Sequence, residues 1–233
     1  MTDICDNVRI VRERIAEAAA RSGRNACDVR LVGVTKTVGV ARINEMLACG
    51  VKDIGENRAQ EMTSKYPELA DENLNWHMIG SLQKNKVKFV VDKVFLIHSV
   101  DSYGLAAEID RISIKAQKIS DILIEVNVAG EASKSGVAPG SCAELIKSIS
   151  QLEHINVKGL MTVAPYAEKP EKTRVYFKKM YELYVDILEK CVNVVIADDF
   201  NVLSMGMTND YAVAVEEGST MVRVGSGIFG ARS

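Results

Sequence analysis

The feature that most constrains the fold is an alternation of strand-like and helix-like segments that runs through nearly the whole sequence. Apolar runs rich in β-branched residues predict strands at 31–35, 51–56, 75–80, 93–100, 121–128, 157–163, 200–206 and 220–225. Apolar residues at helical spacing predict helices at 4–21, 40–49, 57–69, 83–91, 103–117, 142–151, 171–191 and 210–217. Every strand except the last is thus followed by a helix, and one extra helix precedes the first strand.

Strict alternation of this kind predicts parallel strands that are joined by helical crossovers. Eight such units in 233 residues fit an α/β (β/α)8 TIM barrel with an additional N-terminal helix, formed by one domain over residues 1–233. A doubly wound open sheet is the alternative. The first strand-to-helix turn, VTKTVGVA, lacks the GxGxxG pattern that places a helix N-terminus on a pyrophosphate, and this favours the barrel.

Charge and cysteine content exclude several classes of protein. The formal net charge is −2 and there is no basic run, so we expect no nucleic-acid partner. The N-terminal segment 1–23 mixes charged and apolar residues, which predicts neither a signal peptide nor a membrane span. The five cysteines are scattered without ligand-like spacing: Cys5, Cys27, Cys49, Cys142 and Cys191. They are typical of apolar fillers in a reducing compartment, so we expect a cytoplasmic monomer without a metal site.

A lysine follows the first predicted strand, where the chain leaves the core. Active sites of such barrels form at the carboxyl ends of the strands, so residues just after each strand gather at one mouth. Partial burial of Lys36 favours its neutral amine, the form that attacks a carbonyl to make a Schiff base. The simpler interpretation is a lysine that extends its charge into solvent at a strand end.

The last two strands end in motifs that suit an anion. SMGMT (204–208) and GSG (225–227) offer hydroxyls and closely approachable backbone N–H groups in the two loops that often bind phosphate in these barrels. The glycines alternatively serve only tight turns. Arg223 interrupts the apolar strand MVRVG and must be paired with an anion, a dipole or a ring nitrogen, or with Glu216 or Glu217 in a salt bridge. A Schiff-base lysine, an arginine and a phosphate site together indicate a pocket for pyridoxal 5′-phosphate (PLP).

Several segments also resemble a known family. VTKT, IGEN, WHMIGSLQKNK, VNVAGEASKSG, KGLM, LSMGMTND and GSTMVRVGSGIFGAR, in this order, resemble the pyridoxal phosphate homeostasis protein family. The resemblance covers nearly the whole chain. It implies the barrel fold of the alanine racemase N-terminal domain, PLP as the cofactor, and a cytoplasmic protein that supplies PLP to PLP-requiring apoenzymes.

The resemblance also assigns roles to individual residues. It implies that Lys36 is the covalent attachment site of PLP and that Arg223 faces its pyridine nitrogen. The other implied cofactor-binding residues are Ser204, Gly225 and Ser226 at the phosphate, Asn57 beside the ring and Met205 packed nearby. Ser81 stands where proline is common in the family, and Ser226 stands where threonine is common. Serine keeps the hydroxyl, so we still expect phosphate binding.

The arginine decides which chemistry we expect. A cation beside the pyridine nitrogen disfavours its protonation, so the ring is a weaker electron sink than one paired with a carboxylate. Racemases of this type add a tyrosine base together with a second domain, for which a chain ending at Ser233 leaves no room. We therefore expect a PLP-binding protein that is not an enzyme and acts in intracellular PLP homeostasis without efficient amino-acid turnover.

Two alternatives remain open from the residues. A PLP-dependent amino-acid racemase would need Tyr103, Tyr166 or Tyr211 as its second base. A Schiff-base aldolase in the same barrel would use the lysine and the phosphate site on a sugar phosphate.

Three further side chains have predicted roles. His77 and His98 lie inside predicted strands, and we expect them to be hydrogen-bonded structural residues rather than bases. Lys134, in the ASKSG loop, can reach the mouth and receive or pass on PLP, although a solvated loop lysine is the simpler interpretation.

Overall fold

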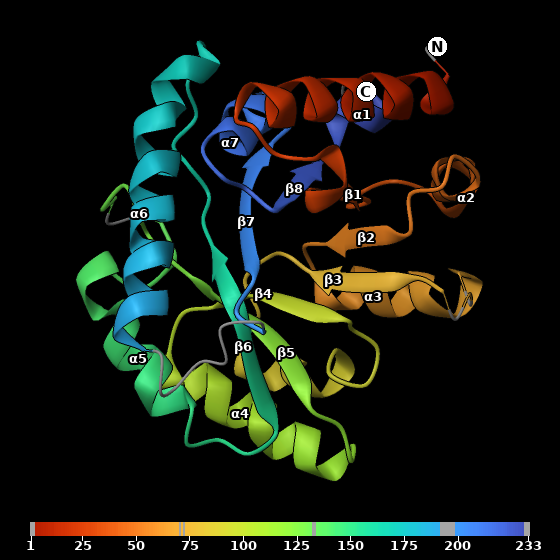
Figure 1. The fold of residues 1–233 in the computed structure, drawn as a ribbon. Coiled ribbons are helices and arrows are strands. Elements are labelled where there is room, and N and C mark those ends of the chain that lie inside the picture. Colours follow the sequence, from red (N-terminus) through yellow and green to blue (C-terminus); the bar gives the residue numbers. More distant parts are fainter. Residues whose placement is uncertain (1–2, 70, 72, 132–133, 192–198, 231–233) are drawn as a thin grey trace.

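Eight parallel strands form a closed barrel in which each strand pairs with the next one along the chain (Figure 1). The computed structural model describes residues 3–69, 71, 73–131, 134–191 and 199–230. The strands are β1 Arg30–Val34, β2 Asp53–Glu56, β3 Asn75–Met78, β4 Leu96–Val100, β5 Ser120–Glu125, β6 Ile155–Met161, β7 Val202–Met207 and β8 Met221–Val224. Pairing of β8 with β1 closes the barrel and confirms the predicted architecture.

The helices surround the barrel, as expected for the crossovers between parallel strands. They are α1 Ile4–Arg21, α2 Val40–Ala48, α3 Ala59–Lys65, α4 Tyr103–Lys115, α5 Cys142–Ile149, α6 Arg174–Lys190, α7 Tyr211–Glu216 and α8 Ser226–Phe229. The predicted N-terminal helix is therefore present as α1, which packs on α2, α7 and α8 (Figure 1).

Two predictions about helices are wrong in detail. The segment expected as a helix at 83–91 forms a 3-10 helix, Lys84–Phe89, in which only Val87 is buried. One buried side chain gives little packing to support a longer α-helix. The last strand is followed by a helix after all, α8, whose four residues are too few to show a helical period in the sequence.

Alternation along the strands divides the apolar side chains between two layers. A small inner cluster fills the barrel: Val32, Leu96, Leu123, Met161 and Met221. A larger outer cluster lies between the strands and the helices. Because successive strand residues point to opposite faces, the parity of a residue decides whether its side chain reaches the interior or the helical layer.

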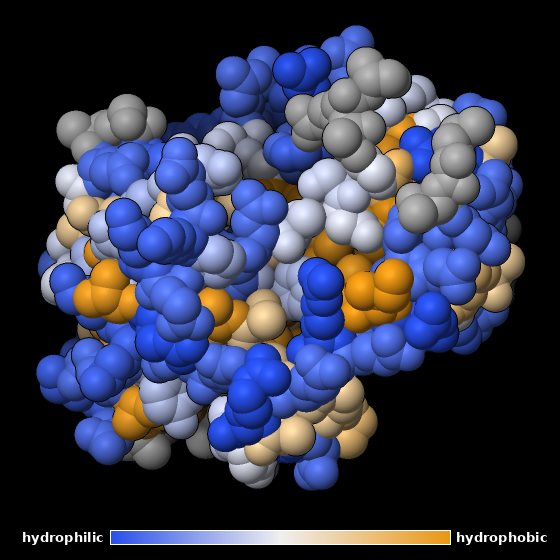
Figure 2. Space-filling model, turned by 90° about the horizontal axis from the view of Figure 1, so that it is seen from above, coloured by the Kyte–Doolittle hydropathy of each residue, from blue (hydrophilic) through white to orange (hydrophobic). Residues whose placement is uncertain are grey.

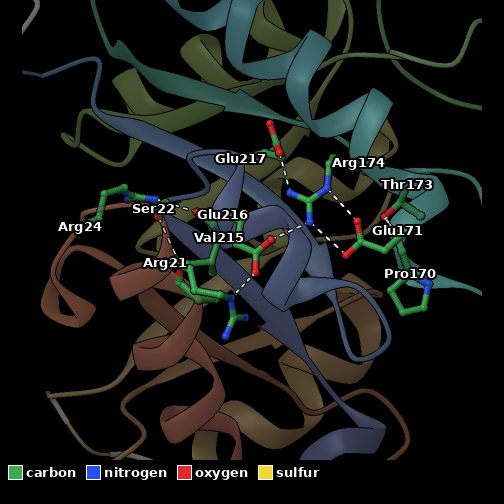
Figure 3. A network of polar contacts seen from close by, with 11 residues as sticks. Arg21, Ser22, Arg24, Pro170, Glu171, Thr173, Arg174, Val215, Glu216 and Glu217 are labelled. Carbon is green, nitrogen blue, oxygen red and sulfur yellow. Dashed lines mark hydrogen bonds and ion pairs between the residues drawn. The ribbon is translucent and has the colours of Figure 1, made fainter.

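An ion-pair cluster on the outside connects α1, α6 and α7 (Figure 3). Arg174 reaches Glu216 and Glu217 at 2.6 Å each, and Arg21 reaches Glu216 at 2.6 Å. Glu171 completes this outer ion-pair cluster through Arg174 at 2.8 Å. The two glutamates considered above as partners of the strand arginine are therefore bound to arginines of the outer helices.

The cysteine interpretation needs a correction. Cys5 of α1 and Cys49, just after α2, form a disulfide, with their Cα atoms 5.4 Å apart. Docking of α1 across the end of α2 brings these residues together, which their separation of 44 positions does not reveal. Cys142 and Cys191 are buried as expected, whereas Cys27 is exposed.

Hydrophilic side chains cover much of the face shown in Figure 2, and the apolar areas between them are small and separate. Within the ranges that the structure describes, the helices are too short or too polar to cross a membrane.

Candidate functional site

A cavity of about 890 Å³ opens at the carboxyl end of the barrel. Its lining comes from the segments that follow β1, β5, β6, β7 and β8, so residues far apart in the sequence meet there. Four of the predicted site residues line it: Lys36, Arg223, Gly225 and Ser226. The lysine and the two last loops thus share one mouth, as expected for the carboxyl ends of parallel strands. Lys134 lines the same cavity.

A threonine that the sequence did not single out joins the two loops. The backbone N–H groups of Gly225 and Gly227 donate to Thr208 Oγ1 at 3.3 and 3.2 Å. A Cβ atom at Gly227 would lie 2.9 Å from Val224 Cγ1 and 3.3 Å from Thr208 Cγ2, so glycine permits this close approach. Thr208 lines the cavity and, as an acceptor of both bonds, still has its own O–H to donate.

Ser204 lies inside the barrel and is fully buried. Its Oγ accepts a hydrogen bond from Arg223 Nη1 at 2.5 Å and lies 3.1 Å from His98 Nδ1. Arg223 Nη2 donates to the Thr162 carbonyl at 2.8 Å. The serine of the SMGMT motif therefore contacts the arginine, whereas the threonine of the same motif lies at the cavity.

The bonds at Ser204 continue through the barrel interior. His98 Nε2 lies 3.0 Å from His77 Nδ1, and His77 Nε2 lies 3.0 Å from Asp53 Oδ1. We call Asp53, His77, His98, Ser204 and Arg223 the inner polar chain. It confirms the prediction that the two histidines are hydrogen-bonded strand residues.

The direction of every bond in the inner polar chain follows from its two ends. Arg223 can only donate, so Ser204 accepts from it; with both rings neutral and His77 donating to Asp53, the O–H of Ser204 is directed to His98 Nδ1. His98 therefore carries its hydrogen on Nε2 and donates to His77 Nδ1. His77 in turn donates from Nε2 to the carboxylate of Asp53. Both imidazoles are neutral Nε2–H tautomers in this arrangement.

Burial sets the charges along the chain. Desolvation lowers the pKa of His77, and it lowers the pKa of His98 further, with a smaller contribution from the neighbouring His77 and Arg223. Both shifts favour the neutral rings that the hydrogen bonds require. Desolvation also lowers the pKa of Arg223 to about 10, which keeps the guanidinium protonated at neutral pH.

A titratable carboxyl group lies close enough to feel Arg223. Desolvation raises the pKa of Glu125, at the end of β5, to about 7, with a further increase from Asp101 and a partial decrease from Arg223. Glu125 therefore changes its charge near neutral pH beside the one arginine that the chain holds in the barrel interior among the described residues.

The other predicted site residues lie in different surroundings. Asn57 is partly buried just after β2. Its backbone packs so closely on Gly80 that a Cβ atom at residue 80 would collide with the Asn57 backbone. Met205 is fully buried in the outer apolar cluster, between strands and helices. Parity explains this, because Ser204 points inward and its neighbour must point outward.

The three tyrosines considered as a racemase base are also separated. Tyr166 lines the cavity but is 79% exposed. Tyr211 is buried in the outer cluster, and Tyr103 lies exposed at the start of α4. The structure therefore brings one of them to the cavity, without burial to fix its ring.

Comparison with known proteins places the chain in a family. A family model described as alanine racemase, N-terminal domain, matches residues 7–233. The pyridoxal phosphate homeostasis protein of Aquifex aeolicus is 46% identical over 228 residues, which cover 98% of each chain. The chain belongs to the pyridoxal phosphate homeostasis protein family.

Two further relatives agree with this assignment. The homeostasis protein of Pseudomonas aeruginosa is 38% identical over 100% of this chain and 97% of its own. The structure of PipY from Synechococcus elongatus, solved with PLP bound, superposes with a TM-score of 0.79 at 33% identity. It covers 93% of this chain and 100% of that one.

Proposed function

We propose that this protein binds PLP in the cavity at the carboxyl end of the barrel and holds it as a Schiff base on Lys36. The observation that supports this most directly is that Lys36, Arg223, Gly225 and Ser226 line one cavity. An amine, a guanidinium and a loop with a serine hydroxyl match the aldehyde, the ring nitrogen and the phosphate of PLP. Membership of the homeostasis family and the PLP-bound PipY structure support the same cofactor.

The geometry refines the residue roles. We propose that Ser226 and Thr208 hold the phosphate, with Gly225 beside them, because all three line the cavity. Arg223 faces the pyridine nitrogen, and Asn57 lies beside the ring. Ser204 supports the site through its bond to Arg223, and Met205 supports it by packing in the outer cluster.

We infer that the protein stores and supplies PLP without efficient amino-acid turnover. When bound, PLP supplies an aldehyde for amine capture and a ring that can accept electrons. Arg223 keeps a positive charge at neutral pH and so disfavours protonation of the ring nitrogen. Racemisation also needs a second base with a fixed position. Tyr166 lies at the cavity, but its side chain is too exposed to be held in one position.

Borohydride reduction tests the attachment. We expect reduction of the yellow PLP-loaded protein to fix the cofactor on the peptide that contains Lys36. Lys36→Ala should lose the absorbance and the label, whereas Lys134→Ala, at the same cavity, should keep both. A label that persists in Lys36→Ala would contradict the assignment.

Deuterium exchange tests the absence of turnover. Alanine incubated with the PLP-loaded protein in deuterated water should keep its α-proton. Rapid exchange or racemisation would favour the racemase. A purified protein that neither absorbs nor gains colour with added PLP would instead favour the aldolase on sugar phosphates.

Supply is the last part of the proposal. We propose that the protein is a cytoplasmic monomer that passes PLP to PLP-requiring apoenzymes. Mixing the loaded protein with such an apoenzyme should restore its activity faster than the release of PLP into buffer allows. Equal rates would mean that transfer proceeds through free PLP. Size-exclusion chromatography with light scattering should give the mass of one chain.

A further inference from the structure

The turn that carries Lys36 has an unusual backbone. Thr37, directly after the lysine, has a φ of 61°. A β-branched residue rarely adopts this left-handed conformation, because its side chain crowds the backbone. The turn has one closing bond of its own, from the Val38 N–H to the Thr35 carbonyl at 3.0 Å, and further contacts come from outside it.

Two side chains of α3 contact the residues on either side of the lysine. Glu61 Oε1 accepts the backbone N–H of Thr37 at 2.5 Å. Lys65 Nζ donates to the carbonyl of Thr35 at 2.7 Å. The two α3 side chains also bind each other at 2.7 Å. One helix therefore binds the residues on both sides of Lys36 in the sequence.

Lys65 is fully engaged in this arrangement. Its third bond goes to Glu56 Oε1 at 2.7 Å, which also accepts from the Thr35 hydroxyl at 2.7 Å. An ammonium has three hydrogens, and each has an acceptor. Lys65 is buried and its three N–H groups are all bonded, so it does not compete with Lys36 for an aldehyde.

The cost of the network indicates that it does more than stabilise the fold. Glu56 is fully buried, and its Oε2 has no hydrogen-bond partner among the described residues. Buried ion pairs of this kind add little net stability compared with apolar packing, but they fix the positions of the groups that they join. Here the fixed groups are the two peptide units that flank Lys36.

We propose that Glu61 and Lys65 are positioning residues that hold the 35–37 turn in its left-handed conformation and so direct Lys36 into the cavity. The proposal rests on the attachment of PLP at Lys36. Neither residue lines the cavity. Their effect is on the orientation of the amine, and a small misplacement of a reacting group is enough to slow its reaction strongly.

Hydrogen exchange and trapping kinetics test the proposal together. In the protein without PLP, Glu61→Ala should speed amide exchange of residues 34–39 by roughly 10-fold, because the bond from Thr37 is lost. The rate at which added PLP is trapped on Lys36 by borohydride should fall by roughly 10-fold. Glu68→Ala, on the exposed segment after α3, should change neither rate.

A second substitution separates positioning from simple anchoring of α3. Glycine adopts the left-handed conformation without steric cost, so Thr37→Gly added to Glu61→Ala should restore most of the trapping rate. Thr37→Val added instead should not, because valine is also β-branched. Slow trapping that glycine fails to restore would overturn the proposal.

The outcomes also separate this proposal from the proposed function. If wild-type protein traps no PLP on Lys36, the proposed function fails, while the exchange of residues 34–39 still decides whether Glu61 holds the turn. If trapping and exchange in Glu61→Ala both match wild type, the positioning role is wrong and the attachment at Lys36 stands. Should Glu61→Ala not fold, Glu61→Gln keeps the acceptor for Thr37 and removes the ion pair with Lys65. We then expect a smaller rise in the amide exchange rate of residues 34–39. The absence of any rise would reject the positioning role.

Discussion

Two polar networks of this protein use similar groups in opposite surroundings. The inner polar chain crosses the barrel interior, where His77, His98 and Ser204 are fully buried. The outer ion-pair cluster joins helices on the surface, where its side chains range from 19% exposed at Glu216 to 69% exposed at Glu171 (Figure 3). Water can replace a lost partner in the outer cluster and cannot do so inside the barrel.

The two networks also differ in whether the direction of each hydrogen bond is fixed. Inside the barrel each link has one donor and one acceptor, and the order from Arg223 to Asp53 permits a single arrangement of hydrogens. Outside, Arg174 holds three carboxylates at once, at a site that water can reach. The inner polar chain is thus suited to fix the orientation of Arg223 at the cavity, whereas the outer cluster needs only to keep helices together.

Breaking the inner polar chain should have the largest effect. Ser204→Ala leaves Arg223 Nη1 and His98 Nδ1 without their partner in a buried site. We expect the free energy of unfolding to fall by about 3 kcal/mol, because an unpaired buried charge is costly. Urea denaturation at fixed PLP loading measures this.

A surface serine provides the control for that experiment. Ser150→Ala removes an exposed hydroxyl that donates to the Lys147 carbonyl and accepts a long bond from Gln151 Nε2 at 3.4 Å, and should cost less than about 0.5 kcal/mol. Equal effects of the two substitutions would show that burial does not distinguish the two kinds of network.

The charge of Glu125 should give an intermediate effect with a definite sign. Its pKa is raised from 4.5 to about 7 in the folded protein, so the folded state holds this proton more tightly than the unfolded state. The stability that this group contributes is therefore present below pH 4.5 and lost as the pH rises to about 7.

Comparison with a variant that cannot titrate isolates this group. The stability of wild type relative to Glu125→Gln should fall by about 2 kcal/mol over that range, a figure reduced from the full shift because the side chain is partly exposed. Chemical denaturation at several pH values measures the difference. A constant difference from pH 4.5 to 7 would contradict the raised pKa.

A contrast between local patterns and contacts made only in the folded structure explains which parts of the structure could be predicted from sequence. Strand and helix alternation is local, so the barrel and the meeting of Lys36 with the last two loops followed from it. Which hydroxyl of SMGMT reaches the cavity cannot be predicted from the local sequence. It depends on where β7 ends, because Ser204 lies within the strand, whereas Thr208 follows its last residue and lines the cavity.

Long-range pairs were equally hidden. Glu61 and Lys65 are four residues apart on α3, a spacing that in sequence suggests only an exposed helical pair. Their contacts with Thr35 and Thr37 depend on how α3 docks on the barrel. The Cys5–Cys49 disulfide depends in the same way on the docking of α1.

Breaking the outer ion-pair cluster should have the smallest effect, and one that salt can remove. Arg174→Met keeps the length of the side chain and loses the bonds to Glu216 and Glu217. We expect the free energy of unfolding to fall by about 1 kcal/mol at low salt, because a network of partly exposed pairs is worth little more than one of them. In about 0.5 M NaCl the difference from wild type should shrink by roughly half, since screening acts on exposed charges.

Ser204→Ala should keep its full cost at that salt concentration, because its groups are buried. If salt reduced both costs alike, the proposed distinction between a buried, directed chain and a partly exposed surface cluster would be wrong.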